Sequence, residues 1–123
     1  MSSSRVMVID DDPAIRAALA EWLALVGYTP AMFADGTEAL AAVRADPPDL
    51  IILDYMMVPM DGLAVLAALR AEPHLRSIPV LLLTGFLDDI PSLPQDVATM
   101  RKPFRLEALA ETVRSLLARG AAR

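Results

Sequence analysis

Three continuous apolar runs of strand length constrain the fold of this chain more than any other feature of its sequence. They are VMVI at 6–9, LIIL at 50–53 and PVLLLT at 79–84. A strand with one face in water alternates apolar and polar residues, whereas a strand covered on both faces is apolar throughout. The three runs therefore predict a parallel sheet with helices packed on both faces.

Helical patterns separate these runs, so strand-type and helix-type segments alternate along the chain. In PAIRAALAEWLALVG, Ile15, Leu19 and Leu23 share one stripe, and Asp12 before Pro13 is typical of a helix N-cap followed by the first helical residue. Weaker strands are expected at 28–33 and 97–100, and further helices at 35–45, 63–72 and 105–119. Five such units predict an α/β, doubly wound parallel sheet.

The fourth unit departs from this regularity. Pro91 and Pro94 prevent a long helix from running between the fourth and fifth strands, so we expect the fourth helix to be shortened or irregular. The whole chain, 1–123, is expected to form one domain, with a core at about 5–119 and a frayed tail at 120–123.

Composition excludes several classes of function. The formal net charge is −5 with no basic cluster of the kind that nucleic-acid binding needs, so no direct nucleic-acid partner is expected. No apolar run approaches the roughly 18 residues of a membrane span, and MSSSR is not followed by the apolar segment of a secretory signal. The chain has 0 cysteines, which fits a reducing compartment. We therefore expect a cytoplasmic protein that binds no membrane.

Polar residues follow the predicted strands at the edge where parallel strands end. The residues at these positions are Asp10, Asp11 and Asp12 after the first strand, Asp54 after the third, Thr84 at the end of the fourth and Lys102 after the fifth. Ligands of open α/β sheets bind outside the carboxyl ends of the strands. The sequence therefore predicts one site at this edge.

The residue types indicate the chemistry of that site. Carboxylates a few ångströms apart do not all stay ionised without a cation, and Mg²⁺ prefers oxygen ligands of this kind. Lys102 adds a mobile positive charge, and the Thr84 hydroxyl adds a hydrogen-bond donor. Together these groups could stabilise the charge of a phosphoryl group during its transfer.

Five motifs in this order resemble the receiver domain of bacterial two-component response regulators, the CheY-like superfamily. They are IDD at 9–11, LIILDYMM at 50–57, MDG at 60–62, LLLTG at 81–85 and KPF at 102–104. The resemblance covers residues 5 to about 119 and implies a flavodoxin-like (βα)5 fold with strand order 2-1-3-4-5.

The resemblance also implies roles for single residues. Asp54 would accept a phosphoryl group from a histidine kinase or a histidine phosphotransfer protein, Thr84 would bond a phosphoryl oxygen, and Lys102 would pair with it. A cis peptide bond is implied before Pro103. The domain would catalyse only its own phosphorylation and dephosphorylation.

The implied metal site uses the acid pair and the loop after the third strand. Asp11 would bind Mg²⁺ directly, Asp10 through water, and Asp54 and the backbone carbonyl of Met56 would complete the protein ligands. Asp12 fills a variable position of the family, and its role as a helix cap explains it.

Several positions depart from the family pattern. Val58 stands where proline is usual and Pro59 follows it, so we expect an altered turn and an intact site. Thr99 replaces the aromatic residue through which receivers usually signal, which puts the common dimerisation mode in doubt. Met56 and Phe86, both apolar, would flank the route of an attacking water, which predicts slow autodephosphorylation.

Two alternatives remain open from the sequence. The chain could be an atypical receiver that acts as a phosphorylation-independent interaction module, although the acid pair, the acceptor aspartate and the lysine are all present. It could also be a phosphatase with an aspartyl-phosphate intermediate, but Tyr55 and Met56 stand where a second catalytic aspartate is needed. The expected protein is a monomer or weak dimer, and its downstream effector is not indicated.

Overall fold

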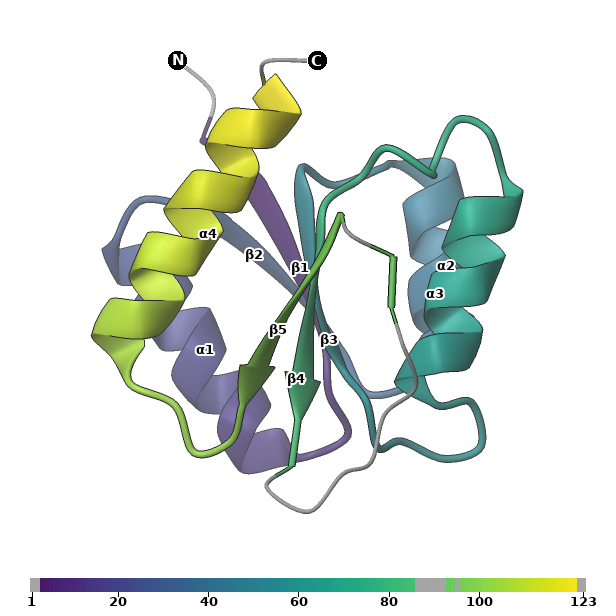
Figure 1. Cartoon of the computed structure of the whole chain (residues 1–123). Coiled ribbons are helices and arrows are strands. Elements are labelled where there is room, and N and C mark those ends of the chain that lie inside the picture. The colour runs from purple at the N-terminus through teal and green to yellow at the C-terminus, as the bar shows by residue number, and fades with distance from the viewer. Residues whose placement is uncertain (1–2, 86–92, 95, 122–123) are drawn as a thin grey trace.

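The computed structural model describes residues 3–85, 93–94 and 96–121, and these contain one parallel five-stranded sheet (Figure 1). The strands are β1 (Arg5–Ile9), β2 (Thr29–Phe33), β3 (Leu50–Asp54), β4 (Val80–Thr84) and β5 (Val97–Arg101). Their order is β2-β1-β3-β4-β5, which confirms the predicted order. Each apolar run of the sequence is a central strand, and β2, which contains a proline, lies at an edge.

The described residues also form four helices, which cover the two faces of the sheet in pairs (Figure 1). They are α1 (Pro13–Leu25), α2 (Gly36–Ala45), α3 (Gly62–Ala71) and α4 (Leu106–Ala121). Helices α1 and α4 pack on one face, and α2 and α3 pack on the other. Within the described ranges, no helix combines the length and the apolar character that crossing a bilayer requires.

The two cores explain why the central strands are apolar throughout. In β3, Ile52 belongs to the same core cluster as Leu19 of α1 and Val113 of α4, whereas the next residue, Leu53, belongs to the cluster that contains Val65 of α3. Successive side chains of a strand point to opposite faces, so both faces need apolar residues. The sheet is thereby held from both sides, and its carboxyl edge is a rigid platform for the groups that follow the strands.

Three aspartates begin the helices that flank this edge. The side chains of Asp12, Asp35 and Asp61 each accept a hydrogen bond of 2.9 Å from a backbone N–H in the first turn of α1, α2 and α3. This N-cap geometry confirms the role expected for Asp12. The caps fix where each helix starts, and therefore fix the short loops that leave β1 and β3.

Two expectations concern the last part of the chain. The expected shortened helix between β4 and β5 falls mainly on residues 86–92 and 95, which lie outside the described residues. Helix α4 runs through Ala121, two residues past the expected end at 119. A side chain at Gly120 would lie 3.5 Å from the ring of Pro79, so the end of this helix packs beside the start of β4.

Candidate acid site at the carboxyl edge of the sheet

Four neighbouring strands bring the predicted site residues together. Asp10 follows β1, Asp54 ends β3, Thr84 ends β4 and Lys102 follows β5. The Lys102 ammonium nitrogen lies 3.0 Å from Asp10 Oδ2 and 3.1 Å from Asp54 Oδ1. One carboxylate oxygen from each of Asp10, Asp11 and Asp54 lies within 4.8 Å of the others. The structure thus assembles the predicted cluster from residues up to 92 positions apart.

The two acids of the pair have different surroundings. Asp10 is fully buried, and its carboxylate is already engaged: Oδ1 accepts from the backbone N–H of Asp12 at 2.9 Å, and Oδ2 accepts from Lys102. Asp11 is exposed, and its carboxylate has no hydrogen bond or ion pair among the described residues. Asp11 is therefore the acid of the pair that is free to bind an added cation.

The charges of the site are not balanced. Burial, and after it the negative charge of Asp10, raise the pKa of Asp54 from 3.8 to about 6, although the hydrogen bond and the charge of Lys102 act to lower it. Burial alone would lower the pKa of Lys102, but its hydrogen bonds to Asp10 and Asp54 outweigh burial and raise it. A cluster of hard oxygen donors that is short of positive charge fits a divalent cation such as Mg²⁺.

The loop between β3 and α3 packs closely on the backbone of Asp54. The N–H of Gly62 donates to the Tyr55 carbonyl at 2.9 Å, and a Cβ at Gly62 would lie only 2.6 Å from the Asp54 carbonyl oxygen. The loop contains a cis peptide bond between Val58 and Pro59, where an altered turn was expected. In the sequence, Gly62 stands within the MDG motif, just before the expected helix at 63–72, and this close approach was not predicted from it.

Met56 lies in the same loop, two residues after Asp54, with its side chain exposed. Phe86, expected to flank the other side of the site, lies outside the described residues. The role of the Met56 carbonyl as a metal ligand therefore remains a prediction from the family pattern.

The fourth and fifth strands join beside the site through their backbones. Thr84 is buried, and its carbonyl accepts a 2.7 Å hydrogen bond from the N–H of Lys102. The peptide bond between Lys102 and Pro103 is cis, as predicted. Thr99, the residue at the family's aromatic position, is exposed on β5.

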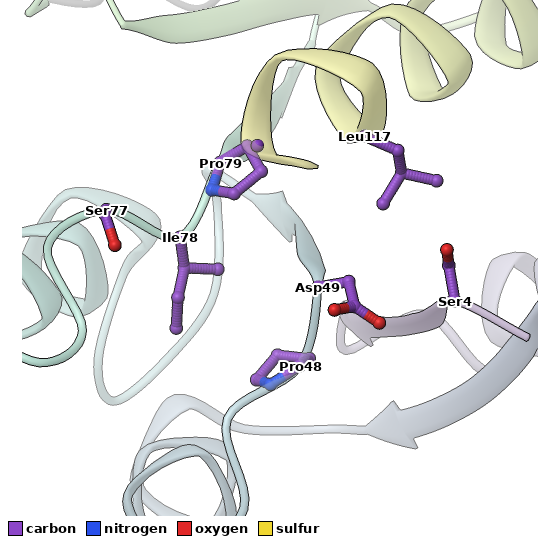
Figure 2. A pocket seen from close by; sticks show the side chains of 8 residues that line it. Ser4, Pro48, Asp49, Ser77, Ile78, Pro79 and Leu117 are labelled. Carbon is purple, nitrogen blue, oxygen red and sulfur yellow. The ribbon is translucent and has the colours of Figure 1, made fainter. Parts of the chain in front are cut away.

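Hollows lie at both ends of the strands. A groove of about 540 Å³ beside Lys102 is lined mainly by Ile15, Gly85, Pro103 and Phe104. The other, of about 240 Å³, lies where the strands begin, and Figure 2 shows Pro79, Asp49 and Ser4 around it. The carboxylate in this hollow, that of Asp49, already has a partner, because its Oδ2 accepts a 2.7 Å hydrogen bond from the backbone N–H of Arg5. The acidic cluster and the hollow at the start of the strands are therefore separate features.

Comparison with known proteins agrees with this geometry. The family model for the response regulator receiver domain matches residues 6–114. The chain belongs to this family. The response regulator MprA of Mycobacterium ulcerans is 38% identical over 125 residues, and the match covers 95% of this chain and 51% of MprA. This receiver domain thus spans about half the length of the relatives that it matches.

Solved receiver structures show the same fold. The signal receiver domain of a signal transduction histidine kinase from Syntrophus aciditrophicus is 34% identical, with a TM-score of 0.82 over 94% of this chain and 91% of that chain. The chemotaxis protein CheY4 of Vibrio cholerae is 27% identical, with a TM-score of 0.81 over 94% of this chain and 99% of that chain. The chain is a receiver domain, a phosphoacceptor in two-component signalling, and not a classical enzyme.

Proposed function

We propose that Asp54 accepts a phosphoryl group from the phosphohistidine of a histidine kinase or a histidine phosphotransfer protein, with Mg²⁺ bound, and that this modification changes partner binding. The observation that carries the proposal is the contact of one ammonium, Lys102, with two buried carboxylates, beside an exposed third one. The proposal takes residues 1–123 as one receiver domain that acts in the cytoplasm, which the absence of cysteine supports.

The residues of the chain have distinct parts in the transfer. An oxygen of the ionised Asp54 carboxylate attacks phosphorus, a new O–P bond forms, and the N–P bond to the donor histidine breaks with its electron pair left on the imidazole nitrogen. Lys102, 3.1 Å from Asp54 Oδ1, is placed to pair with the added phosphoryl oxygens. The Thr84 hydroxyl, at the end of the adjacent strand, donates a hydrogen bond to one of them.

The acids hold the cofactor. Asp11, which has no other partner among the described residues, and Asp54 would bind Mg²⁺ directly, Asp10 would bind it through water, and the Met56 carbonyl would add a further ligand. When bound, Mg²⁺ supplies positive charge that offsets the negative charge of the phosphoryl group. The Asp10 carboxylate keeps its present partners and orients the Lys102 ammonium.

The donor has an apolar surface beside the acids on which to dock. The groove lined by Ile15, Pro103 and Phe104 lies next to Lys102, so a helix of the donor that packed there would present its histidine to Asp54. MprA is named a response regulator and is about twice the length of this chain. The effector that reads the phosphorylated state is not specified by the described residues, and a monomer or weak dimer is the expected assembly.

The test is phosphorylation by phosphoramidate or acetyl phosphate, read by intact-protein mass. The wild type should gain one phosphoryl group only when Mg²⁺ is present, and Asp54→Asn should gain none. Asp12→Asn is a matched control because asparagine also caps helices, and it should be phosphorylated like the wild type. If the wild type binds Mg²⁺ but gains no phosphoryl group, the interaction-module alternative replaces this proposal, and a phosphorylated Asp54→Asn would place the acceptor elsewhere.

A further inference from the structure

Arg16 of α1 reaches back to the acid site through its side chain. Its Nη1 donates a 2.8 Å hydrogen bond to the backbone carbonyl of Asp10, and its own N–H bonds the Asp12 carbonyl at 3.0 Å. Arg16 as a residue is half-buried. We propose that Arg16 is a positioning residue that orients the peptide between Asp10 and Asp11, and so sets the position of the exposed metal ligand.

With this contact, every hydrogen-bonding group of Asp10 is occupied. Its N–H donates to the Phe33 carbonyl at 3.1 Å, and its two carboxylate oxygens accept from Asp12 and Lys102. The Asp10 carbonyl is the fourth group, and Arg16 is its partner. Asp10 is therefore fixed by four groups, which come from β2, from the N-cap residue of α1, from α1 itself and from the residue after β5.

Asp11 depends on this arrangement more than Asp10 does. Its carboxylate has no partner among the described residues, so only the backbone on either side determines where it lies. The carbonyl bonded by Arg16 belongs to the peptide that leads directly into Asp11. Groups that orient metal ligands typically change metal affinity about 10- to 100-fold when they are removed.

The positive charge of Arg16 and its hydrogen bond have opposite effects on Mg²⁺ affinity. The direction in which the Kd for Mg²⁺ changes therefore tests the proposal. A guanidinium near the acids repels a divalent cation, so losing the charge alone would tighten Mg²⁺ binding by about two- to fivefold. Losing the orientation of Asp11 would weaken binding instead. Arg16→Met removes both the charge and the hydrogen bond, so the direction of its effect shows which of the two dominates.

The experiment titrates metal-free protein with Mg²⁺ and follows amide chemical shifts, without any phosphodonor. We expect Arg16→Met to raise the Kd for Mg²⁺ about tenfold. Arg16→Lys, which keeps the charge and a flexible donor, should raise it less. Arg114→Met, which removes a charge from an exposed position of α4, is the matched control and should leave the Kd unchanged. The proposal is overturned if the Kd of Arg16→Met for Mg²⁺ is unchanged or lower than that of the wild type. If Arg16→Met does not fold, the same outcome in Arg16→Lys overturns it.

A second readout separates this inference from the proposed function on which it rests. Phosphorylation of Arg16→Met by phosphoramidate should require more Mg²⁺ than that of the wild type to reach half of its own maximal rate. A wild type that binds Mg²⁺ without being phosphorylated would refute the phosphoacceptor proposal and leave the Kd comparison valid. A wild type that binds no Mg²⁺ would overturn the metal site and the role of Arg16 together.

Discussion

Replacing Asp54 by asparagine is expected to stabilise the metal-free protein at neutral pH. The pKa of Asp54 is raised from 3.8 to about 6, and the side chain is only 7% exposed. This rise in pKa means that folding disfavours the ionised carboxylate by about 3 kcal/mol. Asparagine keeps the shape without the charge, and Lys102 retains Asp10 as its partner. We therefore expect the free energy of unfolding of Asp54→Asn to exceed that of the wild type by about 2–3 kcal/mol at pH 7.5.

The pH dependence of this difference follows from the direction of the shift. Since the folded pKa of Asp54 lies above the unfolded value, the wild-type penalty is complete above about pH 6 and disappears below about pH 4. The advantage of Asp54→Asn should therefore fall by roughly half at pH 5 and vanish as the pH approaches 4. Urea denaturation of both proteins with EDTA at several pH values measures it directly.

Two comparisons make the reasoning refutable. Asp11→Asn removes an exposed carboxylate from the same cluster and should stabilise the metal-free protein less than Asp54→Asn does. Adding Mg²⁺ should stabilise the wild type, because a ligand that binds only the folded state favours it. If Asp54→Asn is no more stable than the wild type in EDTA, or if its advantage does not change between pH 7.5 and 5, the electrostatic account of the site is wrong.

Three further outcomes are expected from the same geometry. Lys102→Met should lower the free energy of unfolding by about 2–4 kcal/mol in EDTA, measured with urea, because Asp10 and Asp54 lose their shared cation; Mg²⁺ should restore part of the loss. Gly62→Ala should destabilise the fold by about 1–3 kcal/mol and slow phosphorylation, because its Cβ would lie 2.6 Å from the Asp54 carbonyl oxygen. A free energy of unfolding and a phosphorylation rate equal to those of the wild type would contradict that contact. The phosphorylated wild type should decay over minutes to hours by intact mass, since the apolar Met56 cannot orient an attacking water; a half-life of a few seconds would exclude this.

The strands and the site's main residues could be predicted because both follow from local pattern and one geometric rule. Continuous apolar runs require burial on both faces, and the carboxyl ends of parallel strands meet at one edge. Asp10, Asp54, Thr84 and Lys102 each stand at such an end, so their convergence does not depend on loop details. The cap at Asp12 is equally local, since it involves residues two positions apart.

Three contacts of the site could not be predicted, because they depend on distances between side chains and backbone that the spacing of residues in the sequence does not determine. The reach of Arg16 back to the Asp10 carbonyl requires a particular rotamer and a particular start of α1. The approach of Gly62 to Asp54 depends on how closely α3 packs on the end of β3. The shared contact of Lys102 with two carboxylates likewise needs the actual strand spacing. The family pattern implied a pairing of this lysine with the phosphoryl group, but not its metal-free partners.

The charge count of the site links its stability to its function. Of the three carboxylates, Asp10, Asp11 and Asp54, the first and the last share the ammonium of Lys102 as their contacting cation, which leaves two negative charges without an ion pair of their own among the described residues. Burial and, after it, the negative charge of the neighbouring carboxylates raise the pKa of Asp54. The two unmatched charges equal the charge that one divalent ion carries. A phosphoryl group on Asp54 would add negative charge again, and Lys102 is the cation on a flexible side chain that can turn toward it. Because the Lys102 backbone bonds the Thr84 carbonyl, that movement would be transmitted first to the adjoining ends of β4 and β5.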